Sequence, residues 1–238
     1  MKALIIFVFL TAYTEANCIK DDYLAKNEVT SFTVPKLPYT YDALNPLYWD
    51  QLLYFHHDFV HKELVDELNN MTSSIDTYRE KTVVDLLQNY AVQDFTLWRY
   101  AGGHYSHSLF WLIMDSHKCN NPEPIGTLKL DIEAKWGTIG DFQKEFSRVA
   151  KGLYGSGWVW LCIDSEKKLV IKAKSDEYNP LAEGFFPFLG LDMWEHAYYF
   201  FYIWDRGAYV DAWWELVDWG LVEYLYEEYS RELIAIPI

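Results

Sequence analysis

Basic residues are scarce in this sequence. Lysine and arginine together number 20, against 35 aspartates and glutamates, which leaves a formal net charge of −15. A protein that binds nucleic acid needs a cationic face for the phosphates, so this composition excludes nucleic acid as a partner. It also disfavours an anionic membrane surface. Any anionic substrate would need a local positive field to offset the overall charge.

Cysteine is also rare, with three residues and no CxxC motif. Cys162 stands in the apolar run Trp158 to Ile163, and we expect it to be a small buried hydrophobe. Cys18 and Cys119 would pair in an oxidising compartment only if the fold brings them together, which the sequence does not decide. We expect no transmembrane segment in the mature chain, because no stretch after the N-terminus is long and apolar enough.

The first sixteen residues have the pattern of a secretory signal peptide. Lys2 is followed by the apolar run Ala3 to Leu10, and small residues precede a cleavage site after Ala16. An uncleaved anchor or a lipid on Cys18 are alternatives. Asn70-Met71-Thr72 is a glycosylation sequon, which agrees with a secretory route. We therefore expect a secreted or lumenal protein.

Half of the residues are hydrophobic and 18% are aromatic, the profile of a globular protein with a large core. Residues 1–16 precede a polar extension over 17–34. The patterns predict a helical hairpin domain over 35–120 and an α+β domain over 121–238. The boundary is a stretch that contains Pro122, Pro124 and Gly126. The predicted fold class is therefore α+β.

The first domain should consist of long helices. Asn45 followed by Pro46 is a good helix start, and the apolar stripe predicts one helix from Pro46 to Asn69. A second helical stretch is predicted over Val83 to Trp98. Gly102-Gly103 should interrupt it before an apolar helix over His104 to Asp115.

The second domain should pair helices with a small antiparallel sheet of about three strands. The predicted helices are Leu128 to Trp136, Gly140 to Gly152, Tyr209 to Leu216 and Val222 to Leu233. The predicted strands are Trp158 to Ile163, Leu169 to Lys174 and Phe185 to Leu191.

Three histidines stand in strongly apolar surroundings: His56, His107 and His196. Asp192 precedes His196 by four residues. Three imidazole nitrogens and one carboxylate oxygen suit manganese, iron or zinc. These residues are scattered along the chain, and a histidine on an apolar helix is more often a satisfied core residue. The residue types alone leave both interpretations open.

Several motifs in order along the chain resemble the iron/manganese superoxide dismutases. They are Val34 to Tyr39, Tyr41 to Leu44, Gly102-Gly103-His104, His107 to Trp111, Gly155 to Trp158 with Trp160, and Gly190 to Tyr199. The last of these, with Asp-Met-Trp-Glu-His-Ala-Tyr-Tyr, is highly specific. The resemblance implies dismutation of superoxide to oxygen and hydrogen peroxide at one metal per chain. It implies the ligands His56, His107, Asp192 and His196.

The resemblance also implies roles around the metal. Trp158, Trp160 and Trp194 match apolar walls, and Tyr199 matches a residue near the substrate channel. The glutamate matched by Glu195 reaches the ligand histidine of a neighbouring subunit in the family, which implies a homodimer or a higher homo-oligomer. The Gly102 and His107 motifs are similar to the manganese branch, so we expect manganese, with iron as the alternative.

Three positions depart from the family pattern. The channel histidine and tyrosine match Val60 and Leu64, which we expect on the same helix face as His56. The glutamine that holds the metal-bound solvent in the manganese branch is missing, and Tyr178 is the nearest match. The iron-branch glutamine matches Gly103. Val and Leu cannot relay the protons that superoxide reduction needs.

These departures leave three hypotheses. The first is a superoxide dismutase slowed by the changed surroundings of its metal. The second is a catalytically impaired metal-binding relative that acts as a structural or interaction protein, with the aromatic residues near the C-terminus as a partner surface or a larger core. The third is altered redox chemistry, such as peroxide use, at the same metal.

Overall fold

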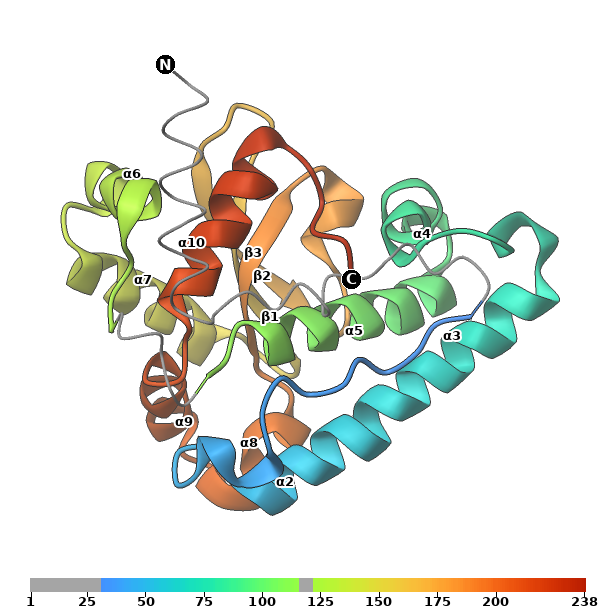
Figure 1. Cartoon of the computed structure of the whole chain (residues 1–238), viewed down its shortest axis with the longest axis horizontal. Coiled ribbons are helices and arrows are strands. Elements are labelled where there is room, and N and C mark those ends of the chain that lie inside the picture. The colour runs from blue at the N-terminus through green and yellow to red at the C-terminus, as the bar shows by residue number, and fades with distance from the viewer. Residues whose placement is uncertain (1–30, 116–121) are drawn as a thin grey trace.

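The computed structural model describes residues 31–115 and 122–238. The predicted signal peptide, most of the predicted extension, Cys18 and Cys119 lie outside these residues. Figure 1 shows a helical half, formed by the blue to green segments, beside a half in which helices surround a small sheet. In the described residues, five 3-10 segments connect these elements: Tyr41–Leu44, Asp76–Tyr78, Ala91–Gln93, Pro180–Glu183 and Ser230–Glu232.

The first long helix is continuous but not regular. It consists of α2 (Asp50–Phe55), a π-helical segment (His56–His61) and α3 (Lys62–Ser74). The predicted start at Pro46 is wrong, because the extended backbone of Trp49 precedes the first helical turn at Asp50. A π-helical turn contains more residues than an α-helical turn, so it changes which side chains share a face.

The second predicted helical stretch is divided. It contains α4 (Val83–Asn89), the 3-10 segment Ala91–Gln93 and then α5 (Phe95–Leu112). Asp94 ends the irregular stretch, since its side chain accepts hydrogen bonds from the first turn of α5.

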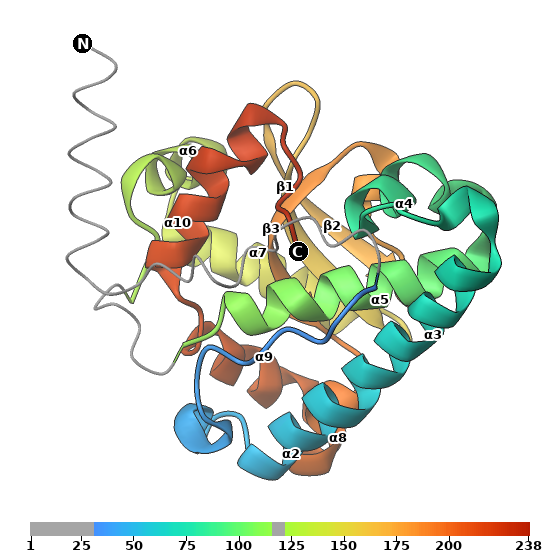
Figure 2. The ribbon, with the colours of Figure 1, turned by 45° about the vertical axis from the view of Figure 1, so that its right-hand side comes forward.

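The expected interruption at Gly102-Gly103 is also wrong, because α5 runs straight through both glycines. Their role is close packing. A Cβ atom on Gly102 would stand 2.1 Å from the carbonyl oxygen of Glu177, and one on Gly103 would stand 2.7 Å from Leu64 Cδ1. Figures 1 and 2 show α5 crossing between α3 and the sheet, which is where such close approaches are needed.

The second half confirms the predicted sheet. Its strands are β1 (Gly157–Ile163), β2 (Leu169–Ser175) and β3 (Phe186–Asp192), paired antiparallel in the order β2-β1-β3. Every residue of the central strand β1 is buried. Helices α5 and α10 (Trp219–Glu228) contact β3, and α6 (Gly126–Trp136) and α7 (Ile139–Gly152) contact β2.

Two further helices complete the chain before α10. One is α8 (Glu195–Tyr202), which the sequence patterns did not predict, and the other is α9 (Arg206–Trp214), which begins three residues before its predicted start. The predicted last helix is α10 followed by the 3-10 segment Ser230–Glu232. Among the residues that the structure describes, no helix is both long and apolar enough to cross a membrane.

The many aromatic residues of the C-terminal part mostly belong to the core. Trp213, Trp219, Tyr209 and Tyr226 are almost completely buried, whereas Trp204 is 83% exposed. Burying one large apolar side chain contributes roughly 1.5–3 kcal/mol. A larger core therefore accounts for most of these aromatic residues, and only a minority of them is available for a partner surface.

The two halves are joined at the level of the backbone. Met114, just after α5, forms an isolated antiparallel bridge with Val217, just before α10. The amide of Asp218 donates to the carbonyl oxygen of Ile113, and the amide of Asp115 donates to that of Leu216. This junction holds the end of α5 in place relative to the sheet, so residues from both halves can form one site.

Candidate metal centre

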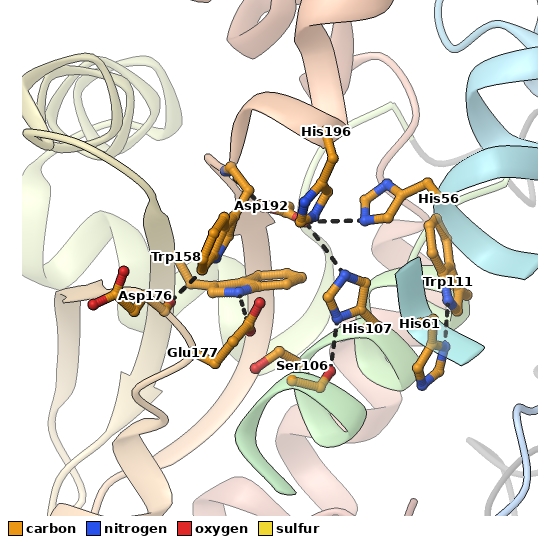
Figure 3. A network of polar contacts seen from close by, with 12 residues as sticks. His56, His61, Ser106, His107, Trp111, Trp158, Asp176, Glu177, Asp192 and His196 are labelled. Atoms are coloured by element: carbon orange, nitrogen blue, oxygen red, sulfur yellow. Dashed lines mark hydrogen bonds and ion pairs between the residues drawn. The ribbon is translucent and has the colours of Figure 1, made fainter. Parts of the chain in front are cut away.

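Four side chains that are far apart in the sequence meet between the two halves. His56 opens the π-helical segment, His107 lies on α5, Asp192 ends β3 and His196 lies in the first turn of α8. One ligand atom from each lies within 4.8 Å of the other three (Figure 3). The structure thus brings together all four residues proposed as ligands. Three are buried, and His196 is partly exposed.

The three imidazoles converge on one carboxylate oxygen. Asp192 Oδ2 lies 3.1 Å from His56 Nε2, 3.2 Å from His196 Nε2 and 3.7 Å from His107 Nε2. The other carboxylate oxygen of Asp192 accepts from the amide of Trp194 at 2.8 Å. This hydrogen bond orients the carboxylate, so that Oδ2 remains directed at the histidines.

Each of two ligand rings has a polar partner on its far side, and for His107 this partner fixes the tautomer. His107 Nδ1 lies 2.7 Å from the carbonyl oxygen of Gly103, so it must be the protonated nitrogen that donates. His56 Nδ1 lies 2.7 Å from the hydroxyl of Tyr48. A proton on Nδ1 leaves the Nε2 lone pair free to face the centre. Such outer partners are typical of metal-binding histidines.

The donor atoms fit a cation. His56 Nε2 and His107 Nε2 are buried and have no hydrogen-bond partner among the described residues. Buried polar atoms without a partner are costly, and a metal ion would satisfy them. Three nitrogens and one carboxylate oxygen suit manganese, iron or zinc.

Burial keeps two of the ligand histidines, His56 and His107, neutral. Loss of solvation lowers the pKa of His56 to about 4, and it lowers the pKa of His107 well below its ordinary value. Burial would raise the pKa of Asp192, but attraction to His196 and His56 outweighs it and lowers that pKa. At neutral pH His56 and His107 are therefore neutral and offer lone pairs, and Asp192 carries a negative charge beside them.

Aromatic rings enclose the cluster. The Trp158 ring meets the His107 ring edge-on with centroids 5.1 Å apart, and Trp160 stacks on Trp158 at 5.3 Å. Trp194 stacks on His196 at 5.5 Å with an interplanar angle of 14°. These rings place apolar surface against the ligands, which lowers the local dielectric and strengthens charge interactions there.

A second pair of buried histidines lies beside the first. His61 Nε2 and His104 Nδ1 are 2.9 Å apart, and Trp111 Nε1 donates to His61 Nδ1. The Trp111 bond makes His61 Nδ1 an acceptor, so His61 Nε2 carries the proton and donates to His104. Their hydrogen bonds are made within the protein, which gives both residues a structural role.

A cavity of about 390 Å³ leads to the ligand histidines. Its lining residues are Leu52, Phe55, His56, Val60, Glu195, His196, Tyr199 and Phe200. Val60 lines it as expected. Leu64 does not belong to this lining and packs over Gly103 instead, because the π-helical segment His56–His61 intervenes between it and the start of the helix.

Tyr178 does not reach the metal centre, which corrects its tentative assignment. Its ring packs edge-on against Trp98, with centroids 3.6 Å apart, and faces Phe95. The preceding residue, Glu177, lies inside instead, and its Oε2 accepts a 2.8 Å hydrogen bond from Trp158 Nε1. The alignment by sequence was one residue out of register, because the loop before Pro180 has no pattern that distinguishes inward from outward side chains.

Sequence analysis also missed Tyr48, which has no motif of its own. Its position eight residues before His56, between Leu47 and Trp49, gives no sign of a contact. The Tyr48 hydroxyl meets the His56 imidazole only because of the path that the chain takes from the 3-10 segment Tyr41–Leu44 into α2.

Acid should destabilise the metal-free protein between about pH 6.5 and pH 4. The pKa values of His56 and His104 are lowered from 6.5 to about 4 by burial. In this window the unfolded chain binds protons at both residues and the folded chain does not, so the stability present above pH 6.5 is lost as the pH falls. Each histidine contributes up to about 1.4 kcal/mol per pH unit.

Urea unfolding of the metal-free protein at pH 7.5, 5.5 and 4.5 measures this loss. The control is His104→Gln, which keeps an acceptor for His61 and should show a shallower pH dependence. A free energy of unfolding that is constant over this range would contradict the neutral state of the buried histidines.

Comparison with known proteins agrees with the geometry. Residues 31–115 match the alpha-hairpin domain of the iron/manganese superoxide dismutases, and residues 124–225 match their C-terminal domain. The protein named "Superoxide dismutase [Mn/Fe] 2" of Staphylococcus aureus strain Mu50 is 38% identical over 201 residues, which are 83% of this chain and 98% of that protein. Its counterpart in the bovine strain RF122 is 37% identical over 201 residues, which again are 83% of this chain and 98% of that protein. The chain therefore belongs to the iron/manganese superoxide dismutase family.

Proposed function

We propose that this superoxide dismutase works with one manganese ion per chain, held by His56, His107, Asp192 and His196. The observation that carries the proposal is the convergence of three imidazole nitrogens and one carboxylate oxygen in a mostly buried site. When bound, the metal supplies the one-electron redox chemistry that converts two superoxide ions into oxygen and hydrogen peroxide. Iron is the alternative metal.

The packing over Gly103 supports manganese over iron. In the iron branch a glutamine stands at this position, as the sequence resemblance implies. A Cβ atom on Gly103 would lie only 2.7 Å from Leu64 Cδ1. A glutamine side chain thus has no room unless Leu64 moves, so the surroundings of the metal do not resemble those of the iron branch.

The approach to the metal centre is mostly apolar. Val60, Phe55 and Phe200 line the cavity in front of His56. An apolar wall excludes water, but it neither attracts an anion nor donates a proton. The hydroxyl of Tyr199 is a polar group on this path. We infer that proton delivery through the cavity is slow and that turnover is lower than in relatives with a histidine at the position of Val60.

The site also supports a homodimer, or a higher homo-oligomer, built around Glu195. This residue is exposed beside the cavity, next to the partly exposed His196. The neighbouring Phe59 and Phe200 are 53% and 56% exposed, and such apolar surface favours association. A sedimentation mass of at least twice that of one chain is the expected result, and a monomeric mass would contradict it.

The apolar run after Lys2 and the glycosylation sequon at Asn70 support a secreted or lumenal protein. Cleavage after Ala16 would give a mature chain that begins at Asn17. N-terminal sequencing of the protein recovered outside the cell tests this, and a chain that retains Met1 would contradict it.

Asp192→Asn should abolish metal retention while leaving the fold intact. The amide has almost the same shape as the carboxylate but removes the only negative charge among the four ligands. Elemental analysis should find about one manganese per chain in the wild type and less than about a tenth of that in the variant. Superoxide turnover, expressed per chain, should fall in parallel.

Asp176→Asn is the matched control, because Figure 3 shows the Asp176 carboxylate directed away from the cluster. It should keep both metal and turnover. A wild-type chain that retains manganese or iron but does not turn over superoxide would favour the structural or interaction role. A chain that retains only zinc would contradict redox chemistry of any kind.

Val60→His should raise turnover per bound metal by at least about tenfold. The new imidazole would stand in the cavity beside His56 and could donate protons during superoxide reduction, where general acids typically contribute 10²–10⁴-fold. Following the decay of pulse-generated superoxide measures the rate. Val92→His, at a 61% exposed position away from the site, is the control. Equal rates for all three proteins would show that protons do not limit turnover.

A further inference from the structure

Glu177 is a buried carboxyl group without a basic partner. Only 4% of the residue is exposed, and none of the ion pairs found in the described part of the chain includes it. Among the described residues, its side chain has one hydrogen bond, the 2.8 Å bond that Oε2 accepts from Trp158 Nε1. Three charged residues interact electrostatically with this carboxyl: Asp192, Arg99 and Asp176. Of these, only Arg99 is positive.

The backbone holds this carboxyl in place from two sides. The Glu177 carbonyl oxygen lies against α5 at Gly102, which has no side chain that would clash with it. Two residues later, Asn179 Nδ2 donates to the hydroxyl of Ser106 at 3.2 Å, and Asn179 Oδ1 accepts from the amide of Leu181 at 3.0 Å. The loop is therefore fixed to α5 at the turn that contains the ligand His107.

The carboxyl is directed toward the metal centre. Figure 3 shows Glu177 reaching beneath the Trp158 indole toward the histidines, whereas the side chain of Asp176 points the opposite way. Trp158 packs against the His107 ring at 5.1 Å. One indole thus connects Glu177 with a metal ligand.

A protonated carboxyl has nearly the shape of an amide. Its carbonyl oxygen accepts a hydrogen bond, and its hydroxyl donates one, as the oxygen and NH₂ of a glutamine do. Burial without a cationic partner raises the pKa of Glu177 well above its ordinary value, which favours the protonated form. Glu177 can thus accept from Trp158 and still donate from its other oxygen.

We propose that Glu177, acting through its hydrogen bond with Trp158, is the positioning residue that sets the reduction potential of the bound metal in place of the glutamine of the manganese branch. The inference rests on the proposed function, because it concerns the same metal. Tyr178, which sequence alignment would place in that role, contacts Phe95 and Trp98 and has no part in it.

Glu177→Gln is the decisive variant. It preserves the shape of the carboxyl and the acceptor for Trp158, but it replaces the acidic hydroxyl, a strong hydrogen-bond donor, by a weaker amide donor that cannot ionise. We expect unchanged metal content and a shift of at least tenfold in the redox equilibrium constant of the bound metal, which is about 59 mV for a one-electron couple. Redox titration of the loaded protein with optical detection measures the potential independently of superoxide turnover.

Tyr178→Phe is the matched control and should leave the potential unchanged. Glu177→Leu removes the acceptor for Trp158 and should destabilise the fold. The test therefore relies on Glu177→Gln. An unchanged potential in loaded Glu177→Gln that still turns over superoxide would overturn this inference alone, and so would an equal shift in Tyr178→Phe. A wild-type chain that takes up no redox metal would overturn both the inference and the proposed function.

Discussion

The convergence of three imidazoles on the Asp192 carboxylate is the constraint on which the rest of the structure depends. A buried carboxylate costs several kcal/mol of desolvation unless positive charge or hydrogen bonds offset it. Here the neighbours are histidine nitrogens that face the same point. A cation at this point would satisfy these nitrogens and offset the charge of the carboxylate. The meeting of the long helix, α5, β3 and α8 at this point follows from that requirement.

Close packing makes the convergence possible. Gly102 lets the loop at Glu177 approach α5, and a Cβ atom on Gly190 of β3 would lie 2.1 Å from the Trp160 ring. Trp160 in turn stacks on Trp158, which contacts His107. The glycines and the large rings form one packed layer, so a change at either glycine would displace the ligands.

The polar groups around the metal are distributed unevenly. On the cavity side, Val60 and its apolar neighbours offer few donors to an incoming anion. On the opposite side, the carboxyl of Glu177 and the indole of Trp158 form a buried hydrogen-bonded pair. The hydroxyl of Tyr48 supports a ligand from a third direction. This distribution is consistent with a site whose redox properties are controlled from the interior while access and proton supply are restricted.

Local pattern was enough to predict most elements, and the resemblance to the family was enough to predict the four ligands. Alternating and periodic hydrophobicity predicted the three strands and most helices, and Asp192 and His196 lie in a motif that is specific to its family. The surroundings of the metal depended on tertiary structure. The direction of Glu177 and Tyr178 depends on how a loop without periodicity docks on α5. The position of Leu64 follows from a π-helical turn. The partner of His56 comes from chain segments that meet only after folding. Non-local packing sets the direction of these side chains.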